Sequence, residues 1–165
     1  MIVVADASPL CYLILIEEVY VLPALYGRVI VPPAVMTELN HERTPSVVRE
    51  WFSAKPEWLH VQAPRQELPS LRDVLGAGEL EAIALAAELS ADALLMDDRD
   101  GRHEAEKRNL AVLGTLRVLA DAAEHGFVDL VVALDRLRQT NFRADDQLIQ
   151  RLLARLDRPG RGGKE

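Results

Sequence analysis

The sequence contains almost no cysteine. Cys11 is the only cysteine among 165 residues, and it stands in an apolar stretch. A lone cysteine cannot form a disulfide within the chain, and we expect it to be a small buried hydrophobic residue. A disulfide scaffold and a cysteine-based mechanism are therefore excluded from the expected classes.

Long apolar runs and a basic leader are also missing. No uncharged run reaches the ~18 residues that a membrane helix needs, and the first residues lack the positive region that opens a secretory signal. We therefore expect a cytoplasmic protein without a membrane partner. The 165 residues suffice for one ordinary domain, and the 49% of hydrophobic residues suffice for a packed core.

Positive charge is scarce in most of the chain. The formal net charge is −7, from 19 Lys and Arg against 26 Asp and Glu. This balance argues against a nonspecific nucleic-acid binder, because phosphate contacts need clustered basic residues. Residues 136–165, however, hold eight basic residues against four acids. This asymmetry indicates either a solvated helix face or a surface for RNA or a partner, with the candidates Arg136, Arg138, Arg143, Arg151 and Arg155.

Short apolar runs alternate with helical patterns along the chain. The first run, residues 2–5, has no polar residue, as expected of a strand buried on both faces. Ser8 then predicts a cap for a helix that starts at Pro9. The repeated order favours a three-layer α/β/α sandwich with a mostly parallel central sheet. We expect strands at 2–5, 28–31, 59–61, 93–96 and 111–113, and helices at 9–16, 34–39, 46–54, 79–89, 101–108 and, capped by Thr115, 116–125.

Two further helices are expected after Gly126. Apolar residues recur at helical spacing within 130–137 and again within 148–156. We therefore predict a single domain over 1–157 that includes these two added helices. Residues 158–165 are rich in glycine, and we expect them to form a disordered tail.

Acidic residues stand where the expected strands end. Asp6 follows the first strand, Asp97 and Asp98 follow a later one, and Glu79 opens the helix that leads to it. Glu38, on the helix after the second strand, can face the same edge. Ligands of open parallel sheets bind beyond the carboxyl ends of the strands, where the strand order reverses. Carboxylates gathered there repel one another unless a hard cation such as Mg²⁺ or Mn²⁺ neutralises them, which predicts a metal site.

Each acid also has a purely structural interpretation. Asp6 could cap a helix, Glu38 could be a solvated helix residue, and Glu79 could complement a helix dipole. The acids within 97–100 could form an ordinary acidic turn. Glu81, two positions after Glu79, points to another face of its helix. The complete set favours the metal site over these separate interpretations.

Four segments, in order, resemble the PIN-domain ribonucleases, a family that includes the toxins of many bacterial toxin–antitoxin pairs. They are 3–10 (VVADASPL), 31–39 (VPPAVMTEL), 76–86 (GAGELEAIALA) and 94–100 (LLMDDRD). The third segment is similar to a subgroup in which a Gly-Glu pair opens the helix that supplies the third acid, where Asp is usual. Gly114-Thr115-Leu116 resembles the same subgroup, and the similarity runs from Met1 to about Leu156.

The resemblance implies roles for individual residues. The implied catalytic acids are Asp6, Glu38, Glu79 and Asp98, and the implied metal ligands are Asp6, Asp98, Asp97 and Glu79. Asp98 is preferred to Asp97, and Glu79 is preferred to Glu81 because it stands at the helix start. We expect supporting roles for Ser8, Asp100 and Thr115, and contacts with RNA or a partner from Arg99, Arg102, Arg136, Arg138 and Arg143.

The activity implied by the resemblance is Mg²⁺-dependent hydrolysis of single-stranded RNA by an endoribonuclease. The subgroup implies the toxin of a type II toxin–antitoxin pair, held in check by a cognate antitoxin protein. The alternative is a non-catalytic PIN-like or receiver-like module that binds metal and partners. A receiver needs a lysine after a late strand, and none of Lys55, Lys107 and Lys164 stands there. A haloacid dehalogenase needs an acid where Ser8 stands, and a dinucleotide fold needs glycines that residues 6–9 lack.

The segment from Pro9 to Tyr26 is unusually apolar. Its apolar residues are too many for the single core-facing stripe of a surface helix. We therefore expect some to be exposed, and exposed apolar patches usually mark a partner surface. The symmetric dimer is the commonest such assembly, so the segment predicts a homodimer contact or an antitoxin groove.

Overall fold

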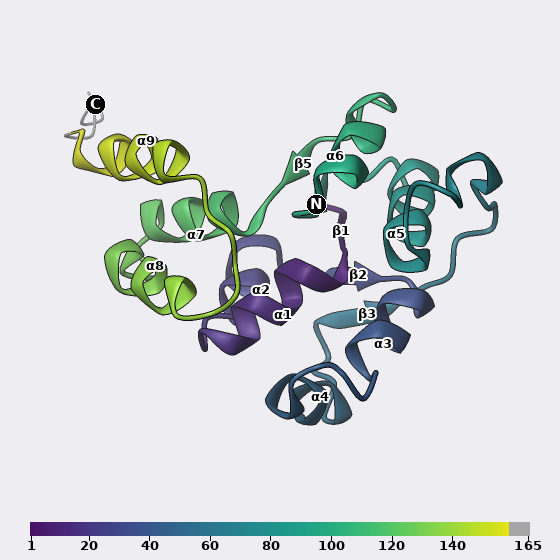
Figure 1. Cartoon of the computed structure of the whole chain (residues 1–165), viewed down its shortest axis with the longest axis horizontal. Coiled ribbons are helices and arrows are strands. Elements are labelled where there is room, and N and C mark those ends of the chain that lie inside the picture. Colours follow the sequence, from purple (N-terminus) through teal and green to yellow (C-terminus); the bar gives the residue numbers. More distant parts are fainter. Residues whose placement is uncertain (159–165) are drawn as a thin grey trace.

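A computed structural model describes residues 1–158 (Figure 1). One sheet of five parallel strands has the order β3-β2-β1-β4-β5. The strands are β1 Val3–Ala5, β2 Val29–Val31, β3 Leu59–Val61, β4 Ala93–Leu95 and β5 Val112–Leu113. The helices are α1 Ala7–Leu15, α2 Val21–Tyr26, α3 Pro33–Leu39, α4 Ser46–Ser53, α5 Ala77–Glu88, α6 Arg99–Glu106, α7 Thr115–Glu124, α8 Leu130–Arg138 and α9 Asp146–Asp157, with a 3-10 turn, η1, at Pro69–Leu71.

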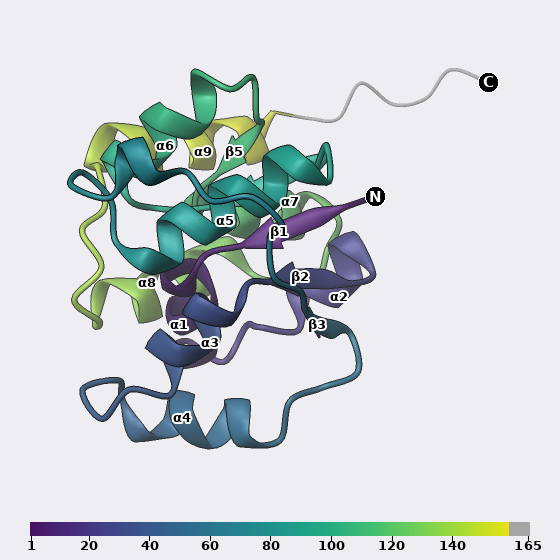
Figure 2. The same ribbon diagram turned by 90° about the vertical axis from the view of Figure 1, so that its right-hand side faces the viewer.

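Helices cover both faces of the sheet. Successive side chains of a strand point to opposite faces, so Val3 and Ala5 join one buried cluster and Val4 joins the other. The first cluster packs the sheet against α1, α2, α3, α4 and α7, with α8 and α9 outside α7, and the second packs it against α5 and α6. Figures 1 and 2 show these layers. The predicted three-layer α/β/α class is confirmed, with a sheet that is wholly parallel.

Two expected helix caps are wrong. The helix α1 starts at Ala7, so its N-cap is Asp6 and Ser8 lies inside the first turn. Likewise α7 has Gly114 as its N-cap, and Thr115 is its first residue. In both places a single residue separates the strand from the helix, so the N-cap position falls on Asp6 and Gly114, and the hydroxyl residue lies inside the first turn.

The apolar segment before Tyr26 is mostly buried, so the expected exposed patch is wrong. It divides into α1 and α2, and residues such as Leu10, Leu13 and Leu22 are fully buried in the core. The reason is that α1 has neighbours on several sides, since it contacts α3, α4 and α7. Of its large hydrophobic residues only Tyr20, 66% exposed, faces solvent.

The two helices after Gly126 are present as α8 and α9. They pack on α7 through buried residues such as Leu134 and Ile149, and so extend the first cluster. Within residues 1–158, no helix has the length and apolar character needed to cross a membrane. The tail expected at 158–165 lies, except for its first residue, outside the described residues.

Candidate functional site

Asp6 lies where the strand order of the sheet reverses. The chain adds β2 and β3 on one side of β1 and then returns to place β4 on the other side. The β1–β4 pairing aligns Ala5 with Leu95, and the Asp6 backbone N–H donates to the Leu95 carbonyl at 2.9 Å. Asp6 therefore stands beside the residues that follow β4, at the edge where parallel sheets bind ligands.

The Asp6 carboxyl is buried and incompletely satisfied. Only 1% of the residue is exposed, its side chain makes no cap hydrogen bond to α1, and its Oδ1 has no hydrogen-bond partner within residues 1–158. Burial raises the pKa of Asp6 to about 8, and repulsion from Glu79, Glu38 and Asp97 adds to the shift. A buried acceptor without a partner is costly, which points to a ligand at this position.

Asp97 and Asp98 follow β4 but have different surroundings. The Asp97 carboxylate accepts the Thr115 backbone N–H at Oδ1 and the Thr115 hydroxyl at Oδ2, both at 2.7 Å. Burial raises the pKa of Asp97 in spite of these bonds. The exposed Asp98 instead caps α6 by accepting the Gly101 N–H at 2.8 Å. Asp97 and Asp98 both line the cleft described below, but Asp97 is the one whose charge acts on Asp6, so the structure favours Asp97 and the preference for Asp98 stays a prediction.

Three glutamates lie on α3 and α5. Glu79, in the first turn of α5, repels both Asp6 and Glu38 and raises the pKa of each after the larger effect of desolvation. Glu38 accepts the Gly78 N–H at 3.0 Å, and a Cβ at Gly78 would displace the Glu38 carboxylate from this position. Glu81 caps the start of α3 by accepting the Ala34 N–H at 2.9 Å. Glu79 is therefore the acid of α5 that faces the candidate site.

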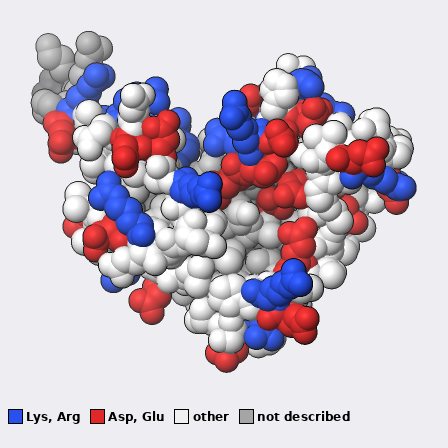
Figure 3. Space-filling view, in the orientation of Figure 1, with Lys and Arg blue, Asp and Glu red and all other residues white. Residues whose placement is uncertain are grey.

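A cleft of about 1180 Å³ opens from these acids between α6 and the α7–α9 side. Figure 3 shows the hollow, with acidic side chains gathered within it and basic ones near its rim. Of the arginines expected to contact RNA, Arg99, Arg102 and Arg143 line this cleft. The others do not, and Arg136 instead contacts the Ile16 carbonyl and Glu18.

Several residues of the cleft were not predicted from the sequence. They are Tyr12 on α1, Arg117 on α7, and Asn141 and Phe142 in the loop before α9. Tyr12 stands in an apolar helical segment, where an aromatic residue is expected to be part of the core. Asn141 and Phe142 stand in a loop, and no local pattern indicates that this loop belongs to the cleft. The predicted Ser8 does line the cleft, so a supporting role for its hydroxyl stays a prediction.

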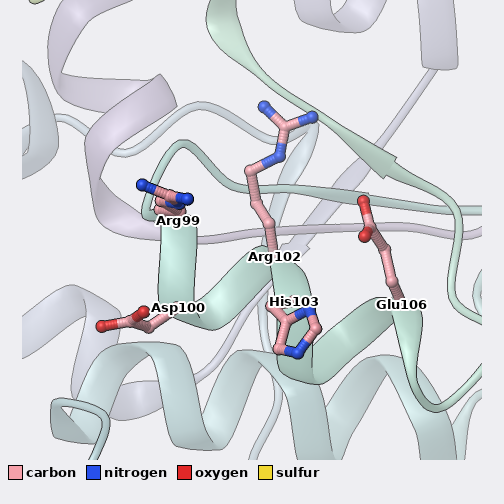
Figure 4. A pocket seen from close by; sticks show the side chains of 5 residues that line it. All are labelled: Arg99, Asp100, Arg102, His103 and Glu106. Carbon is pink, nitrogen blue, oxygen red and sulfur yellow. The ribbon is translucent and has the colours of Figure 1, made fainter.

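The outer face of α6 forms a second, shallower hollow of about 610 Å³. It is lined by Arg99, Asp100, Arg102, His103 and Glu106 (Figure 4). In that view Asp100 points away from Arg102 and Glu106. Asp100 is not among the residues that line the acidic cleft. No contact of Asp100 with the acidic cleft therefore supports its expected role. Arg99 and Arg102, by contrast, line both hollows.

The acids fit a divalent cation by their chemistry. Asp6, Glu38, Glu79 and Asp97 all carry carboxylates, the ligands that Mg²⁺ and Mn²⁺ prefer. The Asp6 Oδ1 without a hydrogen-bond partner lies among them. No three acidic, His or Cys side chains of residues 1–158 are close enough to form a ligand shell as they stand. Asp6, Glu79 and Asp97 would hold the ion after a closer approach of their side chains.

We expect Glu79→Gln to lower activity and Glu81→Gln to lower stability. Loss of the Glu79 charge relieves repulsion at Asp6 and removes an acid from the site, so the RNA cleavage that the resemblance implies should fall at least about tenfold while the fold is retained. Loss of the Glu81 charge weakens the α3 cap, so the free energy of unfolding should fall by about 0.5–2 kcal/mol while activity is retained. Thermal melts and RNA cleavage assays on both variants check this pair, and a Glu81 variant that loses activity while melting normally would contradict it.

Thr115 should act through Asp97. Thr115→Val removes the hydroxyl hydrogen bond to Asp97 Oδ2 and leaves the backbone bond intact. We expect a loss of metal affinity of about 10–100-fold, as for other residues that orient a ligand. Thr115→Ser keeps a hydroxyl and should restore most of the affinity. Calorimetric titration with Mn²⁺ measures both, and equal affinities for the Val and Ser variants would refute the role.

The fold and the acidic edge define an α/β domain whose candidate site lies at the switch point of a parallel sheet. The chain belongs to the PIN-domain family, since the family DUF3368, described as PIN domain, matches residues 2–158. Proteins of this family are in general nucleases.

A solved structure supports the same fold. The chain is similar to a PilT N-terminus domain protein from the hyperthermophilic archaeon Sulfolobus solfataricus P2, with a TM-score of 0.56 and 21% identity. The match covers 76% of this chain and 96% of that chain. At this identity the likeness concerns the fold. No protein with a curated description matches this chain.

Proposed function

We propose that this protein is a metal-dependent endoribonuclease that cleaves single-stranded RNA with Mg²⁺ or Mn²⁺. The observation that carries the proposal is Asp6, buried at the switch point with a free Oδ1 and surrounded by the charges of Glu79, Glu38 and Asp97. Such a cluster is unfavourable by itself and becomes favourable when a cation binds.

Different residues would bind the ion and the RNA substrate. Asp6, Glu79 and Asp97 would bind the ion, and Thr115 orients Asp97. A bound Mg²⁺ or Mn²⁺ supplies an activated water and neutralises charge that develops on the phosphate. The cleft arginines, Arg99, Arg102, Arg117 and Arg143, would hold the phosphates of the RNA on either side of the acids.

Cleavage of a labelled single-stranded RNA tests the proposal. We expect cleavage with Mg²⁺ or Mn²⁺ and none with EDTA. Glu79→Gln should cut at least about tenfold more slowly, and Asp73→Asn, at an exposed acid outside the cleft, should retain the parent's rate. A protein that binds Mn²⁺ yet leaves RNA intact in every condition would favour the alternative, a non-catalytic metal-binding interaction module.

The cellular role proposed for this activity is that of the toxin of a type II toxin–antitoxin pair, acting in the cytoplasm. The support is the resemblance of the sequence to the toxin-like subgroup. A cognate antitoxin protein and a homodimer are part of this proposal. Growth arrest on expression, relieved by the product of a neighbouring gene, would support the toxin role, and light scattering would measure the oligomeric state. Normal growth at high expression of the active protein would refute the toxin role.

A further inference from the structure

The cleft is larger than a metal-bound phosphate needs. Its volume of about 1180 Å³ exceeds the range of about 300–1,000 Å³ in which pockets hold whole small molecules. The acids occupy one end, and α1, the 141–145 loop and the start of α9 form the other. A nucleotide next to the cleaved phosphate would therefore extend from the acids toward this second end.

The second end has the features of a base-binding site. Tyr12 lies edge-to-face against Phe142, with ring centroids 4.9 Å apart and an interplanar angle of 86°. The Tyr12 hydroxyl donates to Asn141 Oδ1 at 2.9 Å, across 129 residues of sequence. Both rings are half-buried and Asn141 is exposed, and all three residues line the cleft, so the amide and the aromatic pair are neighbours at its surface. Aromatic platforms beside basic residues are the usual binding sites of unstacked bases.

The hydrogen bond from Tyr12 determines what Asn141 can offer. Its Oδ1 accepts from the tyrosine, which fixes the orientation of the amide and leaves the Nδ2 hydrogens as its donors for a ligand. An amide N–H donor pairs with a carbonyl oxygen, which uracil and guanine carry on the edge where adenine carries an amino group. Asn141 therefore favours a base with a carbonyl at that edge over adenine.

Tyr12 is also next to the acids. Burial has the largest effect in raising the pKa of the Tyr12 hydroxyl, Cys11 the next largest, and the charge of Asp97 a smaller one. Tyr12 and Asp97 line the same cleft, as do Arg143 beside Phe142 and Arg117 on α7. A phosphate at the acids and a base on the platform can thus belong to one nucleotide or to adjacent ones.

We propose that Tyr12, Asn141 and Phe142 form a base-recognition subsite that gives the protein a preference for RNA with a keto base next to the cleaved phosphate. This inference rests on the proposed ribonuclease function and names the specificity of that site. Asn141 is the specificity-determining residue, Phe142 and Tyr12 provide the platform, and the Tyr12 hydroxyl positions the Asn141 amide.

Binding in EDTA tests the subsite without cleavage. Fluorescein-labelled decauridylate and decaadenylate are titrated with the full chain, and fluorescence anisotropy gives the two dissociation constants. We expect decauridylate to bind about fivefold or more tightly than decaadenylate. Asn141→Asp, which replaces the donor with an acceptor, should abolish or invert this ratio. Tyr12→Phe keeps the ring and should lower the ratio toward one, with a smaller loss of overall affinity.

A matched control separates charge from recognition. Gln150→Glu adds the same single negative charge on the exposed outer side of α9 and should leave the ratio at the parent value. A parent ratio near one, or an unchanged ratio in Asn141→Asp, would overturn the subsite. A parent that binds decauridylate selectively but cuts no RNA would support the subsite and overturn the nuclease proposal.

Discussion

Replacement of Asp6 with asparagine is expected to abolish RNA cleavage and to stabilise the metal-free protein. Cleavage should fall at least about a hundredfold, because the site loses the acid around which the others gather. In the folded protein the pKa of Asp6 is about 8, against 3.8 for a free Asp, so ionised Asp6 is unfavourable without a cation. Folding at pH 7 therefore requires Asp6 to take up a proton, and the neutral asparagine avoids this cost, so the free energy of unfolding should rise by on the order of 2–4 kcal/mol.

Thermal melts in EDTA beside the RNA assay measure both effects. Added Mn²⁺ should raise the melting temperature of the parent and have a much smaller effect on Asp6→Asn, since a ligand stabilises only the state that binds it. Asp73→Asn serves as the control and should match the parent in all three measurements. A variant that melts lower than the parent in EDTA yet still cuts RNA would show that Asp6 is only structural.

Without metal, the stability of the protein should decrease as the pH rises toward 8. The unfolded chain releases the Asp6 proton near pH 3.8, whereas the folded protein keeps it until about pH 8. Between these values the unfolded state binds fewer protons, so the free energy of unfolding falls with rising pH and becomes level above about 8. The raised pKa values of Glu38 and Asp97 act in the same direction.

Metal affinity should show the opposite trend. A cation must displace the proton from Asp6, so the affinity for Mn²⁺ should increase with pH up to about 8 and change little beyond it. Melting curves in EDTA from pH 5 to 9 for the parent and Asp6→Asn isolate the contribution of this residue. The difference between their melting temperatures should widen with pH, and parallel curves would refute the assignment of the raised pKa to Asp6.

Local sequence patterns were sufficient for the sheet and for the position of Asp6. Short apolar runs locate β1, β2 and β4, and the expected 59–61 strand agrees with β3 at both ends. An acid directly after such a strand must lie at the carboxyl edge of a parallel sheet, whatever the helices do. That geometric necessity is why Asp6 could be placed from the sequence.

Contacts between residues far apart in the sequence could not be predicted from local patterns. The choice of Asp97 over Asp98 depends on Thr115, 18 residues away, and the structural use of Glu81 depends on Ala34, 47 residues away. Both pairs of acids look alike locally, and only the tertiary hydrogen bonds separate them. The aromatic end of the cleft joins α1 to a loop that no periodic pattern describes, so no local signal could identify it.

The paired caps at the acidic edge also affect how the protein opens. Glu38 of α3 holds the start of α5 through Gly78, and Glu81 of α5 holds the start of α3 through Ala34. The two helices contribute to different buried clusters and also pack directly on each other, so the first turn of one cannot fray without loss of a bond to the other. Amide hydrogen exchange at Ala34 and Gly78 should therefore report a single opening event that involves both layers. Cooperative protection of this kind keeps the edge that bears Asp6 closed in the protein before any ligand binds.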